Sequence, residues 1–333
     1  MRVLVNSPYP FPAAEADALR REVPGAELLA PPFTPDVERL DGAAVDVLAS
    51  EQVPRNLAAW PRLRWVQLLS AGANHLAGHP VAGAGIPVTT ASGTHGVPIA
   101  QYVTCTALML ALRMPRLLEF QPTRSWPDRV SLAGDALRGR TAGILGYGSI
   151  GRETARQLAA LGLRILCCKR DPGSRTDPGF NAWPGTGDPE GELPAGWYGP
   201  GQLPELLPQC DLLVVTVPGT PATTPMLGAR ELALLRPTAH LIHVSRGGVV
   251  DEEALAAALR AGRLAGAAVD CLSREPPPAD HPLFDAPNLI LTPHISGVHR
   301  GFGEAFARLV RENAARFAAG RPLLNRVDFA AGY

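Results

Sequence analysis

Thr-Ala-Gly-Ile-Leu-Gly-Tyr-Gly-Ser-Ile-Gly, from Thr141 to Gly151, joins a short apolar run to three closely spaced glycines. Residues 142–145 have the composition of a buried strand, and residues 152–161 carry alanine and leucine at helical spacing. The pattern is therefore a strand, a glycine turn and a helix. In a dinucleotide-binding turn the first glycine permits the tight bend, the second lets the backbone approach a pyrophosphate, and the third lets the helix pack on the strand.

This turn predicts a cofactor site. The phosphates would lie at the helix N-terminus, where backbone N–H groups and the helix dipole favour an anion. A glycine triplet alone also occurs in ordinary turns, but the strand before it and the helix after it favour the dinucleotide site. The residues of the turn predicted to bind the cofactor are Gly146, Tyr147, Gly148, Ser149, Ile150 and Gly151.

Length and composition indicate a globular protein of about two domains. The chain has 333 residues, of which 46% are hydrophobic and 19% charged. Basic and acidic residues number 31 each, so the chain has no excess of positive charge that would indicate binding to nucleic acid. No apolar run approaches the ~18 residues that span a membrane, and the N-terminus lacks the apolar core of a signal peptide. The expected partner is a small molecule, with neither nucleic acid nor membrane.

The cysteines are an odd number without the spacing of a disulfide framework or a metal site. Two of them are adjacent in an apolar run that has the composition of a buried strand. We therefore expect reduced core residues in a cytoplasmic protein, and no bound metal. The five are Cys105, Cys167, Cys168, Cys210 and Cys271.

The first part of the chain alternates strand and helix signals. Strands are expected at residues 3–5, 43–49, 65–69 and 88–90, with an amphipathic helix at 13–23. This alternation predicts a parallel sheet of its own. The third of these strands is followed by three small residues at the place where open α/β sheets bind ligands, although a plain turn is the alternative. They are Ser70, Ala71 and Gly72.

A helix from Pro98 to Arg113 carries apolar residues around most of its circumference, so a domain junction or a partner subunit should bury it. After it, six strand candidates alternate with helices, which predicts a doubly wound parallel sheet. Residues 171–201 are rich in proline and glycine and predict an irregular surface excursion, and residues 301–319 form a final helix. The six strands are residues 142–145, 164–168, 212–217, 240–244, 265–269 and 289–291.

Three polar residues stand just past the ends of three late strands. Arg246, Glu275 and His294 could singly be a loop charge, a turn residue and an ordinary loop histidine. Together at the ligand-binding edge of the sheet they suit the reduction of a 2-oxo acid. Arginine holds a carboxylate in a fixed fork, histidine gives a proton near neutral pH, and a neighbouring carboxylate favours the charged imidazolium.

The sequence resembles the D-isomer-specific 2-hydroxyacid dehydrogenases, the family of phosphoglycerate dehydrogenase and the glyoxylate/hydroxypyruvate reductases. The resemblance covers nearly the whole chain. It is specific in Gly-Ile-Leu-Gly-Tyr-Gly-Ser-Ile-Gly (143–151), in His-Val-Ser-Arg-Gly-Gly-Val-Val-Asp-Glu-Glu-Ala-Leu (243–255), and in Val-Asp-Cys-Leu-Ser-Arg-Glu-Pro (269–276) leading to Leu-Thr-Pro-His (291–294). Two departures are His243, where the family usually has Asn, and Gln101, where it usually has Glu.

The resemblance implies an NAD(P)-dependent oxidoreductase that moves a hydride between the cofactor and a 2-oxo acid or D-2-hydroxy acid. It implies that Arg246, Glu275 and His294 are catalytic and that residues 70–72 hold the substrate carboxylate. Asp270 would contact the nicotinamide amide, and Pro218 belongs to the same cofactor set.

The implied architecture has two similar α/β domains. A smaller, flavodoxin-like substrate domain spans 1–97 plus 298–333, and a dinucleotide-binding domain spans 98–297. The family forms homodimers largely through the cofactor domain. A rival from another class is a nucleotide-sensing regulatory module, because corepressors share this fold.

The end of the second cofactor-domain strand bears on the choice of cofactor. NAD enzymes of this fold place an acidic residue there, whereas this chain has Lys169 and Arg170. The two cations predict NADP as the preferred cofactor, with NAD as the alternative. The alternative would follow if Asp171 curled back to bind the ribose.

Overall fold

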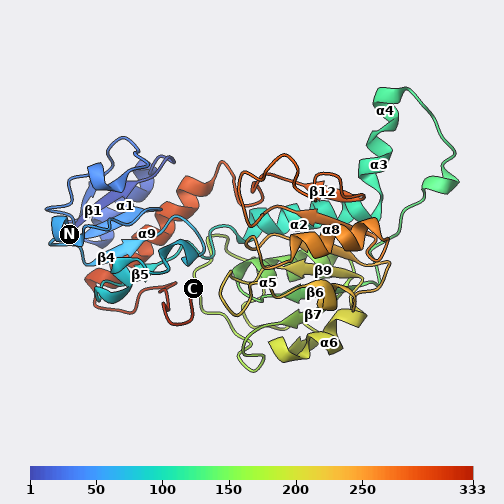
Figure 1. Ribbon diagram of the computed structural model, residues 1–333. Helices are drawn as coiled ribbons and strands as arrows, with labels where there is room; N and C mark the ends of the chain where they lie inside the picture. The colour runs from blue at the N-terminus through green and yellow to red at the C-terminus, as the bar shows by residue number, and fades with distance from the viewer. Residues whose placement is uncertain (333) are drawn as a thin grey trace. The chain divides into compact units, whose positions relative to one another are not determined.

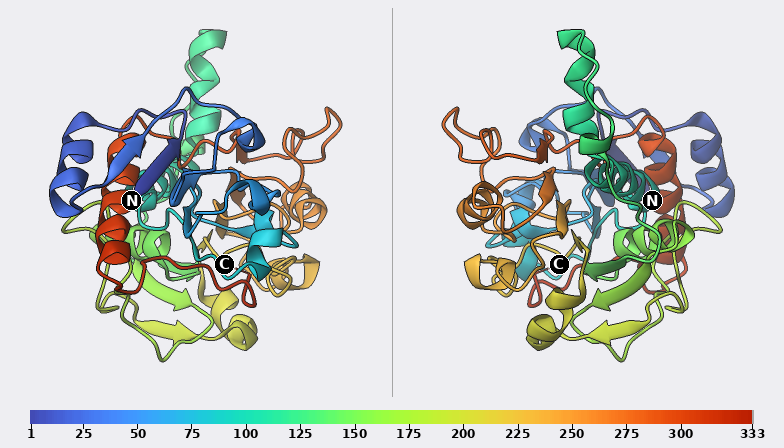
Figure 2. Two further views of the ribbon diagram at one scale, coloured as in Figure 1. Left: turned by 90° about the vertical axis from the view of Figure 1, so that its left-hand side faces the viewer. Right: turned by 90° about the vertical axis from the view of Figure 1, so that its right-hand side faces the viewer.

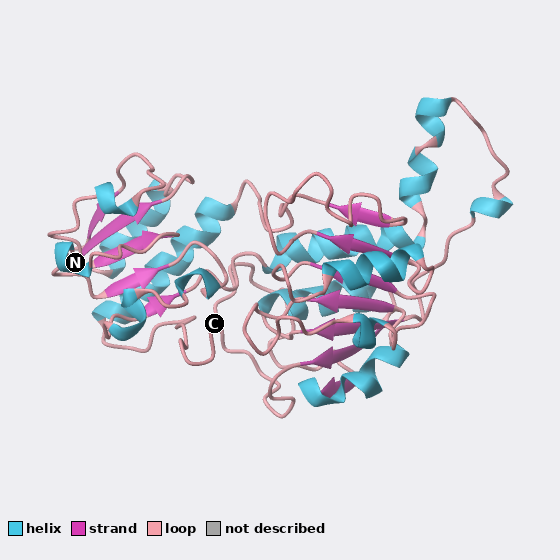
Figure 3. Ribbon diagram, viewed as in Figure 1, coloured by secondary structure: helices cyan, strands magenta, loops and turns pink. Residues whose placement is uncertain are grey.

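The computed structural model describes residues 1–332 and contains two compact α/β units, each built on a parallel sheet (Figures 1 and 3). Unit 1 comprises Met1–His95, Gly179–Pro184 and the chain from Val298 onward. Unit 2 comprises Gly96–Pro178 and Gly185–Gly297. The predicted fold class, a doubly wound sheet with a second flavodoxin-like sheet, is confirmed.

Unit 1 has a five-stranded parallel sheet with the flavodoxin-like order 2-1-3-4-5. Four of its strands were predicted, and the missed one is the short edge strand β2. In spatial order the strands are β2 (Glu27–Leu29), β1 (Arg2–Asn6), β3 (Val47–Ser50), β4 (Trp65–Gln67) and β5 (Val88–Thr89).

Helices cover one face of this sheet and short 3₁₀ turns cover the other. α1 (Ala13–Glu22) and α9 (Phe302–Ala318) pack on each other and share a core with alternate residues of β1. The chain end returns along β5, where Val327 N donates to the carbonyl of Val88. The turns of the opposite face are Val37–Arg39, Leu57–Ala59, Asn74–Leu76 and Pro80–Gly83.

Unit 2 has a seven-stranded parallel sheet (Figure 3). The order along the chain reverses between β6 and β9, and this switch point is where the doubly wound fold binds dinucleotides. All six predicted strands are present, and the seventh is β8. In spatial order the strands are β12 (Leu289–Leu291), β11 (Gly266–Val269), β10 (His240–His243), β9 (Leu212–Val215), β6 (Thr141–Leu145), β7 (Arg164–Cys168) and β8 (Gly196–Tyr198).

Helices cover both faces of the sheet in unit 2. α2 (Gly96–Ala111) and α5 (Ser149–Ala160) share one core with the sheet. The other core receives α6 (Leu203–Leu206), α7 (Ala229–Leu232) and α8 (Glu252–Arg260). Side chains alternate across a strand, so adjacent Cys167 and Cys168 lie in opposite cores. Four cysteines are buried as expected, but Cys105 is exposed on α2, so the expectation of five core cysteines was wrong.

An arm follows α2. It contains α3 (Met114–Leu118), α4 (Phe120–Thr123) and a loop that returns to β6, and it projects from the body of unit 2 (Figures 1 and 2). Trp126 is 100% exposed and Val130 76% exposed on this arm. Among the described residues, no single helix is long and apolar enough to cross a membrane. α2 and the α3–α4 segment pass that test only as a pair bent by 72°.

The proline- and glycine-rich insert, residues 171–201, is irregular up to residue 195, as predicted, but some of its residues are buried, among them Ala182 and Asp188. It ends in β8, which pairs with β7. Its residues 179–184 belong to unit 1, where Ala182 N donates to the carbonyl of Gly93 and Trp183 Nε1 to that of Thr94. The pattern of short apolar pieces between prolines gave no signal for these long-range contacts.

His243, the last residue of β10, is a buried titratable group, 1% exposed. Its Nδ1 lies 3.3 Å from Ser245 Oγ and its Nε2 lies 3.4 Å from Cys271 Sγ. Burial lowers the pKa of His243 to about 4, because the charged imidazolium loses its hydration. His243 is therefore neutral in the folded protein near pH 7.

The shift predicts a loss of stability in acid. In the unfolded chain a histidine binds its proton near pH 6.5, so between about pH 6.5 and 4 the unfolded state binds more protons than the folded state. Stability is complete above that window and falls as pH drops through it, by up to about 1.4 kcal/mol per pH unit from this group. Urea unfolding of His243→Asn between pH 7 and 4.5 should show a shallower pH slope. His75→Asn, which changes a more exposed imidazole, is the control, and equal slopes in all three proteins would contradict the prediction.

Candidate active site

The glycine turn after β6 has the geometry that its spacing predicts. Gly146 has φ +95°, and a Cβ there would lie 2.8 Å from Val217 N. A Cβ on Gly151 would lie 2.1 Å from the carbonyl oxygen of Gly146. By contrast, a Cβ on Gly148 would meet nothing within 4 Å. The first and third glycines are thus required by the fold itself, and the second leaves open space, as the approach of a cofactor needs.

The N-terminus of α5 suits an anion. Gly148 is its N-cap and has no side-chain oxygen to bind the first-turn N–H groups, so a phosphate can take that place. Thr216, just after β9, donates to the carbonyls of Leu145 and Gly146 and holds the turn against the neighbouring strand. Pro218 follows on the same loop, and its carbonyl accepts from Thr223 Oγ1 at 2.6 Å. These residues present the surface on which a dinucleotide would lie.

The end of β7 carries the residues that bear on cofactor choice. Lys169 Nζ donates to the carbonyl of Ser174 and lies 6.0 Å from the Trp197 ring centroid. Burial is the main cause that lowers the pKa of Lys169. Arg170 is exposed. Asp171 accepts from Gly173 N at 3.0 Å, so one of its oxygens is occupied by its own turn.

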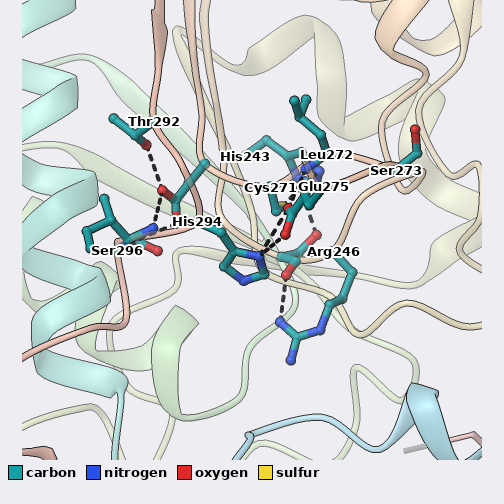
Figure 4. A network of polar contacts seen from close by, with 12 residues as sticks. His243, Arg246, Cys271, Leu272, Ser273, Glu275, Thr292, His294 and Ser296 are labelled. Carbon is teal, nitrogen blue, oxygen red and sulfur yellow. Dashed lines mark hydrogen bonds and ion pairs between the residues drawn. The ribbon is translucent and has the colours of Figure 1, made fainter. Parts of the chain in front are cut away.

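His294 and Glu275 form an ion pair at the carboxyl ends of β12 and β11 (Figure 4). Nδ1 of His294 lies 2.8 Å from Oε2 and 3.1 Å from Oε1 of Glu275, and Leu272 N donates to Oε1 at 2.8 Å. The His294 and Glu275 side chains are 45% and 38% exposed, which leaves the imidazole accessible to a small molecule. His294 has φ +52°, in the left-handed region that few residues other than glycine adopt.

Arg246, after β10, lies beside this pair (Figure 4). Its Nη1 donates to the carbonyl of Ser245 at 2.8 Å. The next residue, Gly247, explains the proximity, because a Cβ there would lie 2.0 Å from the backbone carbon of Leu272. The loops after β10 and β11 therefore touch through backbone, which places Arg246 near Glu275. The structure thus brings the three predicted catalytic residues together.

Asp270, at the end of β11, is 2% exposed and holds the loop that carries His294. Its Oδ1 accepts from Thr292 Oγ1 at 2.6 Å and from Ile295 N at 2.9 Å. Its Oδ2 accepts from Ser296 N at 2.9 Å. The predicted contact with the nicotinamide would come in addition to this structural role.

Sequence reasoning missed two supporting groups. Tyr102 on α2 shares a hydrogen bond of 2.6 Å with Thr292 Oγ1, and burial raises the pKa of Tyr102 to about 12. Glu252, the first residue of α8, accepts from the backbone and hydroxyl of Ser273 and pairs with His281 at 2.9 Å. Acidic residues in the first turn of a helix give no sequence signal that separates such a contact from ordinary helix stabilisation.

The predicted substrate loop lies in unit 1, separated by two residues from the end of β4 at Gln67. Ser70, Ala71 and Gly72 are each half-buried. The hydroxyl of Ser70 donates to the carbonyl of Gly72 at 2.7 Å, and Ala91 N donates to the carbonyl of Ser70 at 2.7 Å. These bonds fix the loop at the carboxyl edge of its own sheet.

Known proteins match both the sequence and this arrangement. The protein-family model named "D-isomer specific 2-hydroxyacid dehydrogenase, NAD binding domain" matches residues 104–296 of this chain. A glyoxylate reductase of Thermococcus gammatolerans is 33% identical over 291 residues, which cover 85% of this chain and 78% of the relative. An (S)-sulfolactate dehydrogenase of Chromohalobacter salexigens is 33% identical and covers 78% of this chain and 79% of its own.

Solved structures agree. A D-isomer specific 2-hydroxyacid dehydrogenase of Xanthobacter autotrophicus, in complex with NADPH and MES, superposes with a TM-score of 0.82 at 28% identity, covering 100% of this chain and 99% of its own. An NADPH-dependent glyoxylate/hydroxypyruvate reductase of Sinorhizobium meliloti, in complex with NADP and sulfate, superposes with a TM-score of 0.77 at 26% identity, covering 100% of this chain and 99% of its own.

Proposed function

Because the chain belongs to the D-isomer specific 2-hydroxyacid dehydrogenases, we propose that Arg246, Glu275 and His294 perform its chemistry. The protein is an NAD(P)-dependent oxidoreductase of 2-oxo and D-2-hydroxy acids. The observation that carries the assignment of residues is the ion pair of 2.8 Å between His294 and Glu275, at the same sheet edge as the glycine turn. The regulatory alternative has no support, since the relatives named above are enzymes.

Each residue has one task. Bound NAD(P)H supplies the hydride that reaches the carbonyl carbon of the 2-oxo acid. His294 donates a proton to the carbonyl oxygen through Nε2, because Nδ1 faces Glu275. The Glu275 carboxylate stabilises the protonated ring and fixes its orientation. Arg246 binds the substrate carboxylate in its planar fork and polarises the adjacent carbonyl.

Replacement of the proton donor tests this mechanism. His294→Gln should lower kcat for the reduction of 2-oxo acids by about 10²-fold or more, since general acid catalysis contributes about 10²–10⁴. Steady-state rates with glyoxylate and hydroxypyruvate measure the loss, and fluorescence titration with NADPH should show that cofactor binding survives. His75→Gln, in unit 1, is the control. Near-normal turnover in His294→Gln would remove this residue from the mechanism.

We propose that the enzyme prefers NADPH to NADH. Lys169 and Arg170 stand where NAD enzymes carry an acidic residue, and a guanidinium or ammonium group can pair with the 2′-phosphate. One oxygen of Asp171, the residue that could instead bind the ribose, accepts from its own turn. Two structural relatives above were solved with NADPH or NADP.

Cofactor preference is read from kcat/KM with NADPH and NADH. Lys169→Asp combined with Arg170→Ser should move the preference toward NADH, with kcat at saturating cofactor retained. The matched control is Arg164→Ser, which removes an exposed arginine from the opposite end of the same strand. A parent enzyme that prefers NADH would show that Asp171 takes the ribose.

We propose a homodimer in which the arm after α2 covers a second copy. Three apolar side chains of the arm are exposed to solvent, Trp126 by 100%, Val130 by 76% and Leu118 by 53%. Exposing apolar surface of this size to water is unfavourable, and a second copy of the chain would bury it.

Light scattering should give twice the 35.2 kDa of one chain, and Trp126→Asp should shift the mass toward the monomer. Phe33→Asp, at an exposed phenylalanine in unit 1, should leave the mass unchanged. A monomeric parent protein would refute the dimer.

A cytoplasmic location is proposed from the cysteines. All five are free thiols, and four are buried in the cores of unit 2 or beside its active site. Such thiols suit a reducing compartment. Cell fractionation tests the location.

A further inference from the structure

The insert, residues 171–201, packs on the glycine turn and the first turns of α5. Three side chains from that region bind it, and each uses a different kind of bond. Tyr147 donates a hydroxyl hydrogen bond, Arg152 donates guanidinium bonds, and Glu153 accepts a backbone bond. The proposed chemistry uses none of these three side chains.

Tyr147 lies between the first two glycines of the turn, Gly146 and Gly148. It is 3% exposed, and its hydroxyl donates to Oδ2 of Asp188 at 2.7 Å. Its ring meets the Trp197 ring edge to face at 5.1 Å and carries the Arg152 guanidinium at 4.9 Å. Burial raises the pKa of Tyr147 far above its ordinary value, so the hydroxyl remains a donor at all working pH values. The tyrosine is thus fixed on several sides.

Asp188 is 7% exposed, and both oxygens of its carboxylate accept hydrogen bonds. Oδ1 accepts from Glu192 N at 2.9 Å, and Oδ2 accepts from Leu193 N at 3.2 Å besides the tyrosine hydroxyl. The carbonyl of the same residue accepts from Arg152 Nη1. Asp188 therefore joins the middle of the insert to the glycine turn and to the first turn of α5, and it also holds residues 188–193 together.

Two further hydrogen bonds and one ion pair join the insert to α5. Arg152, 3% exposed, donates through Nη2 to the carbonyl of Arg175 at 2.6 Å. Its Nε lies 3.3 Å from Oδ2 of Asp177. Glu153, 2% exposed, accepts from Gly187 N at 2.7 Å. Buried charged side chains in the first helical turns are costly unless they are bonded, and here the insert supplies many of the partners.

The position of Tyr147 gives these bonds a consequence. Its neighbours Gly146 and Gly148 have the widest backbone freedom of any residue type, and they flank the peptide groups that a pyrophosphate would contact. A side chain locked between them restricts that freedom before the cofactor arrives. Preorganisation of this kind raises affinity by removing part of the ordering cost of binding.

We propose that Asp188 is a positioning residue for the dinucleotide turn, acting through the Tyr147 hydroxyl. The proposal rests on the proposed function, because it requires that the turn bind the cofactor. Asp188 and Tyr147 set the affinity for NAD(P)H, and they touch neither the hydride nor the proton. Their loss therefore raises the KM and the dissociation constant for the cofactor and leaves kcat at saturating cofactor close to that of the parent.

Tyr147→Phe and Asp188→Asn test the proposal in the full-length protein. Each should weaken NADPH binding by about five- to tenfold, the size expected when one typical hydrogen bond is lost. The double variant should bind no more weakly than the weaker-binding single variant, because both changes act on the same hydrogen bond. kcat at saturating NADPH should stay within about twofold, which a general loss of structure or of active protein would not allow. Glu190→Gln removes an exposed carboxylate two residues away and should change nothing.

The outcomes separate this proposal from the proposed function. A parent enzyme that binds and turns over NADPH, together with a Tyr147→Phe variant of equal affinity, would overturn the positioning role and leave the function intact. A fall in kcat with unchanged cofactor affinity would also overturn it. A parent that binds neither NADPH nor NADH would refute both. If Asp188→Asn does not fold, Tyr147→Phe decides the question, because it removes only the hydroxyl.

Discussion

The hydrogen bonds of the Asp270 carboxylate are the constraint on which the active site depends. One buried side chain accepts from a hydroxyl and two backbone N–H groups of residues 292–296, and so ties the loop after β12 to the end of β11. Without these acceptors the two N–H groups would lie in a poorly hydrated place without partners, at a cost of about 1–3 kcal/mol each. The loop therefore has one favourable conformation, and His294 sits within it.

That conformation is a strained one. His294 has a left-handed backbone, which costs on the order of 1–3 kcal/mol for a residue other than glycine. The Asp270 bonds on both sides of it, and the ion pair to Glu275, compensate for the strain. Glu275 is held in turn by Leu272 N, and Leu272 is held by its contact with Gly247. The direction in which the imidazole points is thus set by backbone geometry as much as by its partner.

Much of this was readable from the sequence, because parallel strands repeat a simple pattern. The six strands of the cofactor sheet and the residues at their carboxyl ends followed from apolar runs, and that was enough to group Arg246, Glu275 and His294. Distances and supporting bonds were not readable, since they depend on strand register and on contacts such as that of Gly247 with Leu272. β8 was missed because Gly196–Tyr198 is too short to show an alternation of apolar and polar residues. It also pairs with a strand that is distant in the sequence. Cys105 was misplaced because an apolar helix does not reveal which of its faces the fold covers.

The insert illustrates how a segment without a core of its own can still be ordered. Its prolines limit the conformations of the unfolded chain, which lowers the entropy lost on folding, whereas its glycines raise that loss. The insert has few large apolar side chains whose burial could offset this loss of conformational entropy. Hydrogen bonds and ion pairs to a rigid neighbour must therefore offset it. Arg152, Glu153 and Tyr147 provide them from the one helix and turn whose geometry the fold already fixes. The conformations of the insert and of the cofactor turn therefore depend on the same hydrogen bonds. A substitution that breaks one of these bonds loosens both segments.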